Sequence, residues 1–143
     1  MRVATGSDHA GFRLKGILAE RLAERGHEVT DLGTHSEDRV DYPDFGAAVG
    51  RAVAAGEADL GVCVCGSGIG IAMAANKVTG VRAAVVHDST SAALARQHND
   101  ANVVCFGQRL IDDGTALDAL DAFLDASFEG GRHVGRVAKL DAL

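Results

Sequence analysis

A cysteine followed by alternating glycines is the segment of this sequence best suited to chemistry. It reads Cys65-Gly66-Ser67-Gly68-Ile69-Gly70. Glycine has no Cβ, so the backbone can turn tightly there and come close to a ligand. Several backbone N–H groups and the start of a following helix would then face one point and attract negative charge. We expect this field to favour the thiolate form of Cys65, which makes it a candidate general base, with Ser67 as a second group able to exchange a proton.

The same segment also fits two roles without proton transfer. Its glycines could serve only a tight turn between a strand and a helix, with Cys65 as a small buried side chain. A dinucleotide-binding G-x-G-x-x-G motif fits poorly, because position 71 is Ile71 and the segment follows the third expected strand rather than the first. The remaining cysteines, Cys63 and Cys105, we interpret as buried apolar side chains, because an odd number of cysteines with C-x-C spacing favours neither a disulfide framework nor zinc.

Two segments containing histidine also allow two interpretations each. Asp8 and His9 follow the first expected strand, where they could contact a ligand, or Asp8 could simply cap a helix. His98 lies at the end of an expected helix and is followed by Asn99. The helix dipole favours a cation at that end, which is an ordinary structural role, but a histidine in a cleft can also exchange protons near neutral pH.

Arginines near the C-terminus offer a binding site for an anion. Arg132 and Arg136 are four residues apart, so a helix would place both on one face. Arg132 would lie in the first helical turn, where the helix dipole opposes a positive charge and a bound anion would offset that conflict. Together with Arg109 they form a candidate phosphate clamp, since guanidinium groups bind phosphate in a fork. The alternative is a solvated basic tail.

Short β-branched runs alternate with Ala- and Leu-rich amphipathic stretches, which predicts an α/β fold with a doubly wound parallel sheet. No repeat or linker interrupts this pattern, so we expect a single domain over residues 1–143. Ligands bind such sheets beyond the carboxyl ends of the strands, where the winding reverses. The expected strands cover residues 2–5, 28–32, 60–65, 81–86 and 103–106, and the expected helices cover 11–24, 43–55, a stretch ending at 76, 89–98, 113–128 and 132–140.

Composition and charge exclude several classes of partner. The net charge is −6 and no basic stripe is present, so we expect no binding to nucleic acid or to an anionic membrane surface. No apolar run approaches the roughly 20 residues that a membrane span requires. The first residues lack a signal-peptide pattern, from which we expect a cytoplasmic location.

Taken together, these motifs resemble the ribose-5-phosphate isomerase type B family, which also includes the galactose-6-phosphate isomerase subunits. The resemblance extends over nearly the whole chain, in the order GSDHAG (6–11), VDYPD (40–44), CGSGIG (65–70), AANK (74–77), HNDAN (98–102) and GGRH (130–133). It implies a Rossmann-like three-layer sandwich with a five-stranded parallel sheet. It also implies a homodimer, or a dimer of dimers, in which the helix at about 132–140 completes the site of the other subunit.

The resemblance implies a role for each matching residue. Cys65 corresponds to the base that moves a proton between C1 and C2 of the sugar, and His98 to the residue that opens the furanose ring. Ser67 and Asp8 correspond to assisting catalytic groups. The implied substrate contacts are Asp8, His9, Tyr42, Gly66, Ser67, Gly68, Ile69, Gly70, Asn99, Arg109, Arg132 and Arg136. Ile71 stands where another branch of the family has a glutamate base, so this chain resembles the cysteine branch, although Ser67 replaces a frequent threonine.

The implied activity is aldose–ketose isomerisation of D-ribose 5-phosphate and D-ribulose 5-phosphate through a cis-enediolate, with neither metal nor cofactor. Such an enzyme serves the pentose phosphate pathway. Three alternatives stay open at this point. The substrate could be allose 6-phosphate, galactose 6-phosphate or a tetrose phosphate; the chain could be a non-catalytic sugar-phosphate-binding protein; or it could be a flavodoxin-like module that binds a nucleotide.

Overall fold

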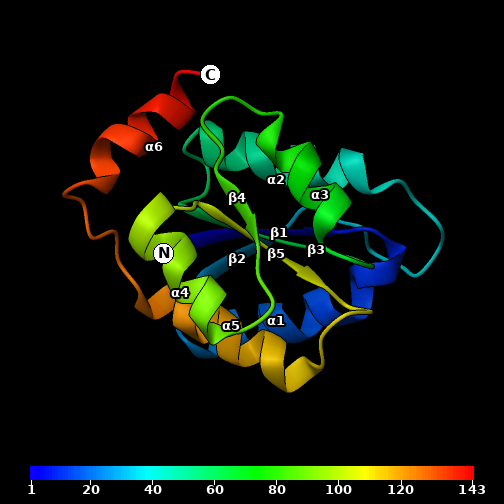
Figure 1. Ribbon diagram of the computed structural model, residues 1–143. Helices are drawn as coiled ribbons and strands as arrows, with labels where there is room; N and C mark the ends of the chain where they lie inside the picture. The colour runs from blue at the N-terminus through cyan, green and yellow to red at the C-terminus, as the bar shows by residue number, and fades with distance from the viewer.

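Five parallel strands form one sheet in the computed structural model, which describes residues 1–143 (Figure 1). The order across the sheet is β2-β1-β3-β5-β4. The predicted α/β fold with a five-stranded parallel sheet is therefore confirmed. The strands are β1 (Arg2–Ser7), β2 (Glu28–Asp31), β3 (Leu60–Cys65), β4 (Ala83–Val85) and β5 (Val103–Gly107).

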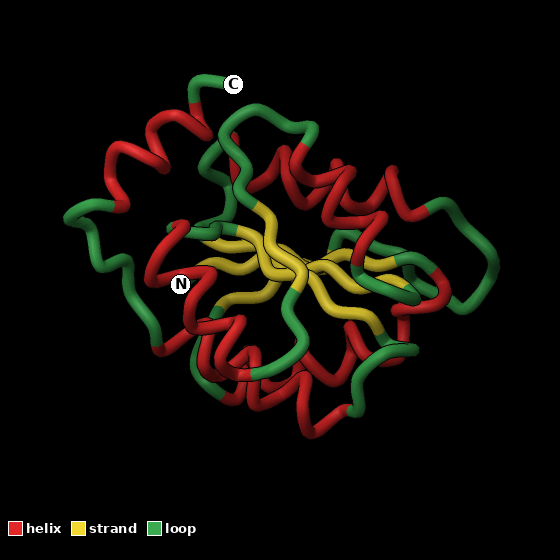
Figure 2. Tube along the Cα trace, viewed as in Figure 1, coloured by secondary structure: helices red, strands yellow, loops and turns green.

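Helices cover both faces of the sheet and make the three layers (Figure 2). On one face α2 (Tyr42–Ala54) packs against α3 (Ile69–Asn76). On the other face α5 (Asp113–Asp125) packs between α1 (Phe12–Glu24) and α4 (Ser89–Asn99). A short 3-10 turn, η1 (His9–Gly11), precedes α1, and the last helix, α6 (His133–Asp141), packs against α4.

The central strand β3 shows why a continuous apolar run becomes a strand here. All six of its residues are buried, as expected for a parallel strand covered by helices on both faces. Successive side chains point to opposite faces, so Val62 and Val64 join the core beneath α1, α4 and α5, whereas Cys63 and Cys65 join the core beneath α2 and α3. This alternation places the thiol of Cys65 on the α2–α3 side.

Several boundaries differ from those predicted. Strand β1 continues to Ser7 because the Ser7 amide donates to the Gly33 carbonyl oxygen at 2.7 Å. Strand β4 is shorter than predicted because the amide of Val81 is used in a turn. Helix α5 ends at Asp125 rather than at 128, since Ala126 adopts an extended conformation with ψ of 155°. Helix α6 begins and ends one residue later than predicted.

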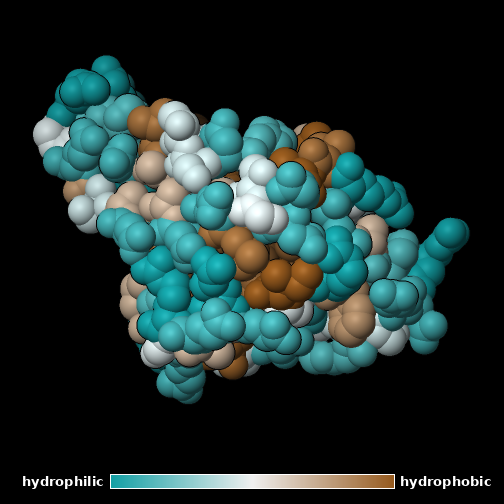
Figure 3. All heavy atoms as spheres, turned by 90° about the horizontal axis from the view of Figure 1, so that it is seen from below, coloured by the Kyte–Doolittle hydropathy of each residue, from teal (hydrophilic) through white to brown (hydrophobic).

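Ion pairs join α1 to α5 on the outer face of the molecule. Arg13 pairs with Asp113 at 2.8 Å, and Asp121 accepts hydrogen bonds from both Arg21 and Arg25. The face seen from below in Figure 3 is mostly hydrophilic, with its most prominent apolar patch near the centre of the view and smaller apolar areas elsewhere. No helix has both the length and the apolar character that crossing a membrane demands.

A buried lysine fixes the loop that follows β2. Lys15 on α1 is only 2% exposed, and its Nζ donates to Asp31 Oδ1 at 2.6 Å and to the Thr34 carbonyl oxygen at 2.5 Å. The loop between β2 and α2 is thereby attached to α1. The loop then runs on to Tyr42 at the start of α2.

We predict that Lys15→Met lowers the free energy of unfolding by about 2 kcal/mol, because the apolar stem is kept while a buried carbonyl and a carboxylate lose their donor. Urea denaturation measures this change. Lys139→Met, at an exposed position of α6, is the matched control and should change stability little. Equal effects of the two substitutions would show that the buried hydrogen bonds do not stabilise the loop.

Candidate active site

The carboxyl ends of three neighbouring strands frame a cavity of about 600 Å³. Strand β1 contributes the residues that follow Ser7, β3 ends in the cysteine–glycine turn, and β5 leads to Arg109. Segments that follow these three strands therefore meet in one cavity, whereas His87 and Asp88, which follow β4, do not line it. The cavity is lined by Asp8, His9, Ala10, Tyr42, Cys65, Gly66, Ser67, Ile69, Gly70, Met73, Arg109 and Leu110.

The thiol of Cys65 lies at the wall of this cavity in contact with a backbone amide. Gly68 N–H donates to Cys65 Sγ at 3.1 Å, and the cysteine is 4% exposed. Gly68 has a φ of 77°, in the left-handed region that favours glycine. A Cβ at position 68 would also lie 2.8 Å from the carbonyl carbon of Phe106. Only glycine can therefore make the turn that aims this amide at the sulfur.

Further amides in the turn have no partner inside the chain. Ile69 N–H donates to Ser67 Oγ at 3.2 Å, but the amides of Gly66, Ser67 and Gly70 donate to no other group of the protein. Gly68 is the N-cap of α3, so the positive end of that helix adds to the field of these amides. Free N–H groups at a helix start suit an anion or an oxygen that becomes negative during a reaction.

Two side chains lie directly over glycines of the turn. A Cβ at Gly66 would be 3.1 Å from Arg109 Nη1, and a Cβ at Gly70 would be 2.5 Å from Cε1 of Tyr42. The absence of side chains at these two glycines thus allows a guanidinium group and an aromatic ring to close over the cavity. Both Arg109 and Tyr42 are exposed, so they can contact a ligand.

Asp8 and His9 approach the cavity from β1. Asp8 is buried, and its Oδ1 accepts the Gly11 N–H at 3.1 Å. It therefore caps η1 and also lines the cavity, so both interpretations of this residue apply. His9 Nδ1 lies 3.2 Å from both the N–H and the carbonyl oxygen of Val40. Nδ1 accepts from the amide in one tautomer of the ring and donates to the carbonyl oxygen in the other, and either contact holds the ring at the mouth of the cavity.

The other predicted residues lie outside this cavity. His98 and Asn99 are at the end of α4, which runs antiparallel to the strands and therefore ends at their amino edge. Asn99 lines a second cavity of about 360 Å³ there. Arg132 is the N-cap of α6, and Arg136 follows one turn later, both exposed. Within one chain, the structure does not bring these four residues to Cys65.

A stacked histidine pair was not expected from the sequence. The rings of His98 and His133 are stacked, with centroids 4.4 Å apart and planes at 16°. His133 is buried and its Nε2 has no hydrogen-bond partner. Burial, followed by the charges of Arg132, His98 and Arg136, lowers the pKa of His133 from its ordinary value. In the sequence, only its position next to Arg132 indicates that His133 could lie near a functional site.

Ligand atoms of His98, His133 and Glu129 lie within 4.8 Å of one another, a spacing that a metal site would also have. The stacking argues against such a site as the rings stand. An imidazole binds an ion along a lone pair in its own plane, and two nearly parallel stacked planes do not share such a point. We therefore assign no metal to this cluster.

Three residues that line the first cavity, Ala10, Met73 and Leu110, were not expected from the sequence. Met73 lies four residues after Ile69 on α3, so helical periodicity would have placed it on the same face. Leu110 adjoins Arg109, but nothing in its type signals a site.

Cys63 and Cys105 are buried, as predicted. They pair in register across β3 and β5. Hydrogen bonding to the Cys63 thiol, and then burial, raises the pKa of Cys105 well above its ordinary value. Cys105 is thus kept as a neutral thiol.

Comparison with known proteins identifies the family of this chain. The model of the Ribose/Galactose Isomerase family matches residues 3–140. The chain belongs to this isomerase family. Escherichia coli Ribose-5-phosphate isomerase B is 49% identical over 142 residues, which cover 99% of this chain and 95% of the relative.

Solved structures of the ribose/galactose isomerase family have the same fold. The Clostridium thermocellum ribose-5-phosphate isomerase B superposes with a TM-score of 0.98 at 50% identity, covering 99% of this chain and 96% of its own. The Mycoplasma genitalium ribose-5-phosphate isomerase B, solved with bound ribulose-5-phosphate, superposes with a TM-score of 0.94 at 44% identity, covering 99% and 94%. The predicted membership of this family is confirmed.

We predict that Gly70→Ala displaces the ring of Tyr42, because the new Cβ would overlap it. Tyr42 is the single tyrosine and the chain has no tryptophan, so tyrosine fluorescence reports this ring alone. Acrylamide quenching should increase in the variant. Gly16→Ala, whose Cβ would meet nothing within 4 Å, is the control and should leave quenching unchanged. Identical quenching in both variants would contradict the placement of the ring over Gly70.

Proposed function

We propose that this chain is an aldose–ketose isomerase that interconverts D-ribose 5-phosphate and D-ribulose 5-phosphate, with Cys65 as the base. The observation that carries the proposal is the Cys65 thiol, hydrogen-bonded to the Gly68 amide at the wall of an open cavity. The choice of sugar is supported by the E. coli relative, which is similar over nearly its whole length.

The proposed reaction moves one proton from C2 to C1 and a second proton from O2 to O1 of the substrate. The Cys65 thiolate removes the C2 proton of the open-chain aldose, and the C2–H electrons form the C1=C2 bond of a cis-enediolate. The carbonyl π electrons move to O1, where the free amides of the turn stabilise the negative charge. A proton passes from O2 to O1, with Ser67 as the relay, and Cys65 returns its proton to C1. The atoms and charges balance without an oxidant, a reductant or a cofactor.

The phosphate end of the substrate needs positive charge that the chain as a whole does not supply. The net charge is −6, yet Arg109, Arg132 and Arg136 form no ion pair within the chain. Unpaired guanidinium groups bind phosphate strongly because each can donate two parallel hydrogen bonds. We assign the phosphate to these arginines, with His9 as a further substrate contact from the wall of the cavity.

The separation of the two groups of residues supports a composite site in a homodimer. Arg109 lies beside Cys65, whereas Arg132, Arg136 and the proposed ring-opening residue His98 lie elsewhere on the chain. A second copy would supply the missing group. Large apolar side chains around the cavity are exposed as they are at interfaces, namely Tyr42 (41%), Ile69 (47%), Leu110 (57%) and Met73 (63%).

Cys65→Ala tests the base. We predict a loss of turnover of about 1,000-fold, since a general base contributes roughly 100- to 10,000-fold. Isothermal titration with ribose 5-phosphate should still show binding, because the phosphate contacts are unchanged. Cys63→Ala, at a buried position on the same strand, is the control and should retain turnover. A Cys65→Ala enzyme with a wild-type kcat would disprove the assignment of the base.

Mixing two inactive variants tests the composite site. Cys65→Ala and Arg136→Ala chains should each be inactive, and subunit exchange after mild denaturation should restore about a quarter of the wild-type activity, because about half of random dimers are heterodimers with one intact site in two. Mass spectrometry of intact dimers verifies the exchange. Verified heterodimers without activity would show that one subunit builds each site alone.

The breadth of the family gives a specific alternative, since its description covers ribose and galactose isomerases. Initial rates with four-, five- and six-carbon sugar phosphates separate these substrates. Binding of ribose 5-phosphate without proton exchange in deuterated water would instead indicate a non-catalytic binding protein.

A further inference from the structure

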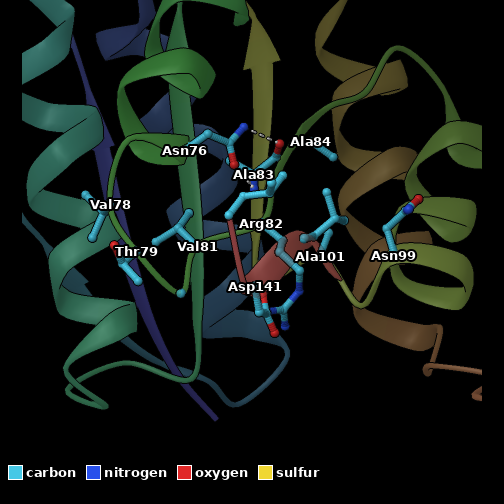
Figure 4. A pocket seen from close by; sticks show the side chains of 13 residues that line it. Asn76, Val78, Thr79, Val81, Arg82, Ala83, Ala84, Asn99, Ala101 and Asp141 are labelled. Carbon is cyan, nitrogen blue, oxygen red and sulfur yellow. Dashed lines mark hydrogen bonds and ion pairs between the residues drawn. The ribbon is translucent and has the colours of Figure 1, made fainter. Parts of the chain in front are cut away.

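Arg82 joins the end of α4, which carries His98 and Asn99, to the end of α6, which carries Arg136. Arg82 Nη1 donates to Asp141 Oδ1, at the end of α6, at 2.8 Å. Its Nε donates to the Asp100 carbonyl oxygen, just after α4, at 3.0 Å. The Arg82 side chain is 17% exposed, and Figure 4 shows it beside Asp141, with Asn99 on the far side of the same cavity.

The backbone of Arg82 is itself held on both sides. Arg82 N–H donates to Asn102 Oδ1 at 2.7 Å, and the Arg82 carbonyl oxygen accepts from Asn102 N–H at 3.0 Å. The residue stands directly before β4, at the amino edge of the sheet. The guanidinium group therefore projects from a fixed point on the sheet, to which both helix ends are attached.

Helix α6 has few other attachments. It stands at the margin of the molecule beside α4 (Figure 1), and only His133 and Val137 of its residues are buried. Its first turn is held by the stack on His98, and the segment before it by Glu129 N–H donating to the Gln97 carbonyl oxygen at 3.0 Å. Both of these contacts are at the amino end. The ion pair with Arg82 is the side-chain hydrogen bond at the carboxyl end, where Leu140 also lies beside the cavity and Val137 is buried one turn earlier. We expect the end of the helix to move more freely when this ion pair is lost.

We infer that Arg82 and Asp141 are positioning residues that set the direction of α6 and thereby aim Arg132 and Arg136 at the phosphate. This inference rests on the proposed function only in assigning phosphate to these arginines. Neither Arg82 nor Asp141 contacts the cavity at Cys65. Asp141 acts through α6, whereas Arg82 also holds Asp100 at the end of α4, so the test is made at Asp141. A clamp of two guanidinium groups depends on direction, since a misplacement of about 1 Å weakens such contacts strongly.

Asp141→Asn is the first test, with inorganic phosphate as the probe. The substitution keeps the size of the side chain and removes its charge. We expect the Kd of phosphate by isothermal titration, and the KM for ribose 5-phosphate, to rise about three- to five-fold, the range for a partly exposed ion pair, with kcat changed less than about two-fold. Hydrogen exchange of residues 133–141 should accelerate, while exchange in β3 stays unchanged.

Two variants control for a general loss of stability. Asp141→Glu keeps the charge and should remain within about two-fold of the wild-type Kd. Asp59→Asn breaks the pair of Arg2 with Asp59, whose N–O distance is 3.0 Å and whose carboxylate is 41% exposed against 45% for Asp141. That substitution lies far along the chain from α6 and should leave both the Kd and the exchange of residues 133–141 unchanged.

The outcomes separate this inference from the proposed function. Faster exchange in α6 with an unchanged phosphate Kd would overturn the positioning role, as would equal effects of Asp141→Asn and Asp59→Asn. A wild-type chain that binds no phosphate would overturn it as well. A wild-type chain that binds phosphate but does not isomerise ribose 5-phosphate would overturn the proposed function, while weaker phosphate binding by Asp141→Asn would still support the inference.

Discussion

The hydrogen bond from the Gly68 amide to the Cys65 sulfur depends on how closely the backbone packs at the end of the sheet. Strands β3 and β5 are neighbours, so the turn after Cys65 must pass against the backbone that follows Phe106. A Cβ at Gly107 would lie 2.5 Å from the Ser67 carbonyl oxygen, and one at Gly68 would meet the Phe106 carbonyl. The glycines therefore do more than give flexibility. They allow the ends of β3 and β5 to come so close that the turn amides, the Cys65 thiol and the start of α3 lie next to one another.

The groups suited to chemistry lie in two separate regions of the chain. The carboxyl edge of the sheet holds the thiol and the free amides, whereas α4 and α6 carry His98 and two unpaired arginines at a distance from it. In a chain of net charge −6, arginines near acidic side chains are neutralised by them, as Arg82 is by Asp141. Arg132 and Arg136 are exposed and unpaired, and Arg132 also opposes the dipole at the start of α6, so both are available to an anion in the proposed homodimer.

Much of the fold could be predicted because each local signal agreed with the next. The buried run at residues 60–65 and the amphipathic stretches indicated that strands alternate with helices along the chain. Parallel strands necessarily place their carboxyl ends at one edge of the sheet. The exchange of β5 and β4 in the sheet order could not be predicted, because a crossover of this length reaches either position. The three-residue length of β4 likewise depends on a turn around Val81 that has no strong sequence signal.

From chain geometry, the candidate site could be predicted where its residues adjoin strand ends. Asp8, Cys65 and Arg109 meet for that reason, whereas Tyr42, at the start of α2, was indicated only by the family resemblance. The stack of His133 on His98 arises from the packing of α6 on α4, and the ion pair of Asp141 with Arg82 joins α6 to the start of β4, in both cases between residues far apart in sequence. Periodicity within one segment carries no information about such contacts.

The central claim is that the Cys65 thiol, alone of the three cysteines, is reached from the cavity and meets the substrate. Alkylation by iodoacetamide, with each cysteine quantified by peptide mass spectrometry, tests it directly. We predict that Cys65 is alkylated at least about ten times faster than Cys63 and Cys105, because thiolate character and access control the rate, and that ribose 5-phosphate protects it. Uniformly slow alkylation of all three, or modification of Cys65 that ribose 5-phosphate does not slow, would contradict the account.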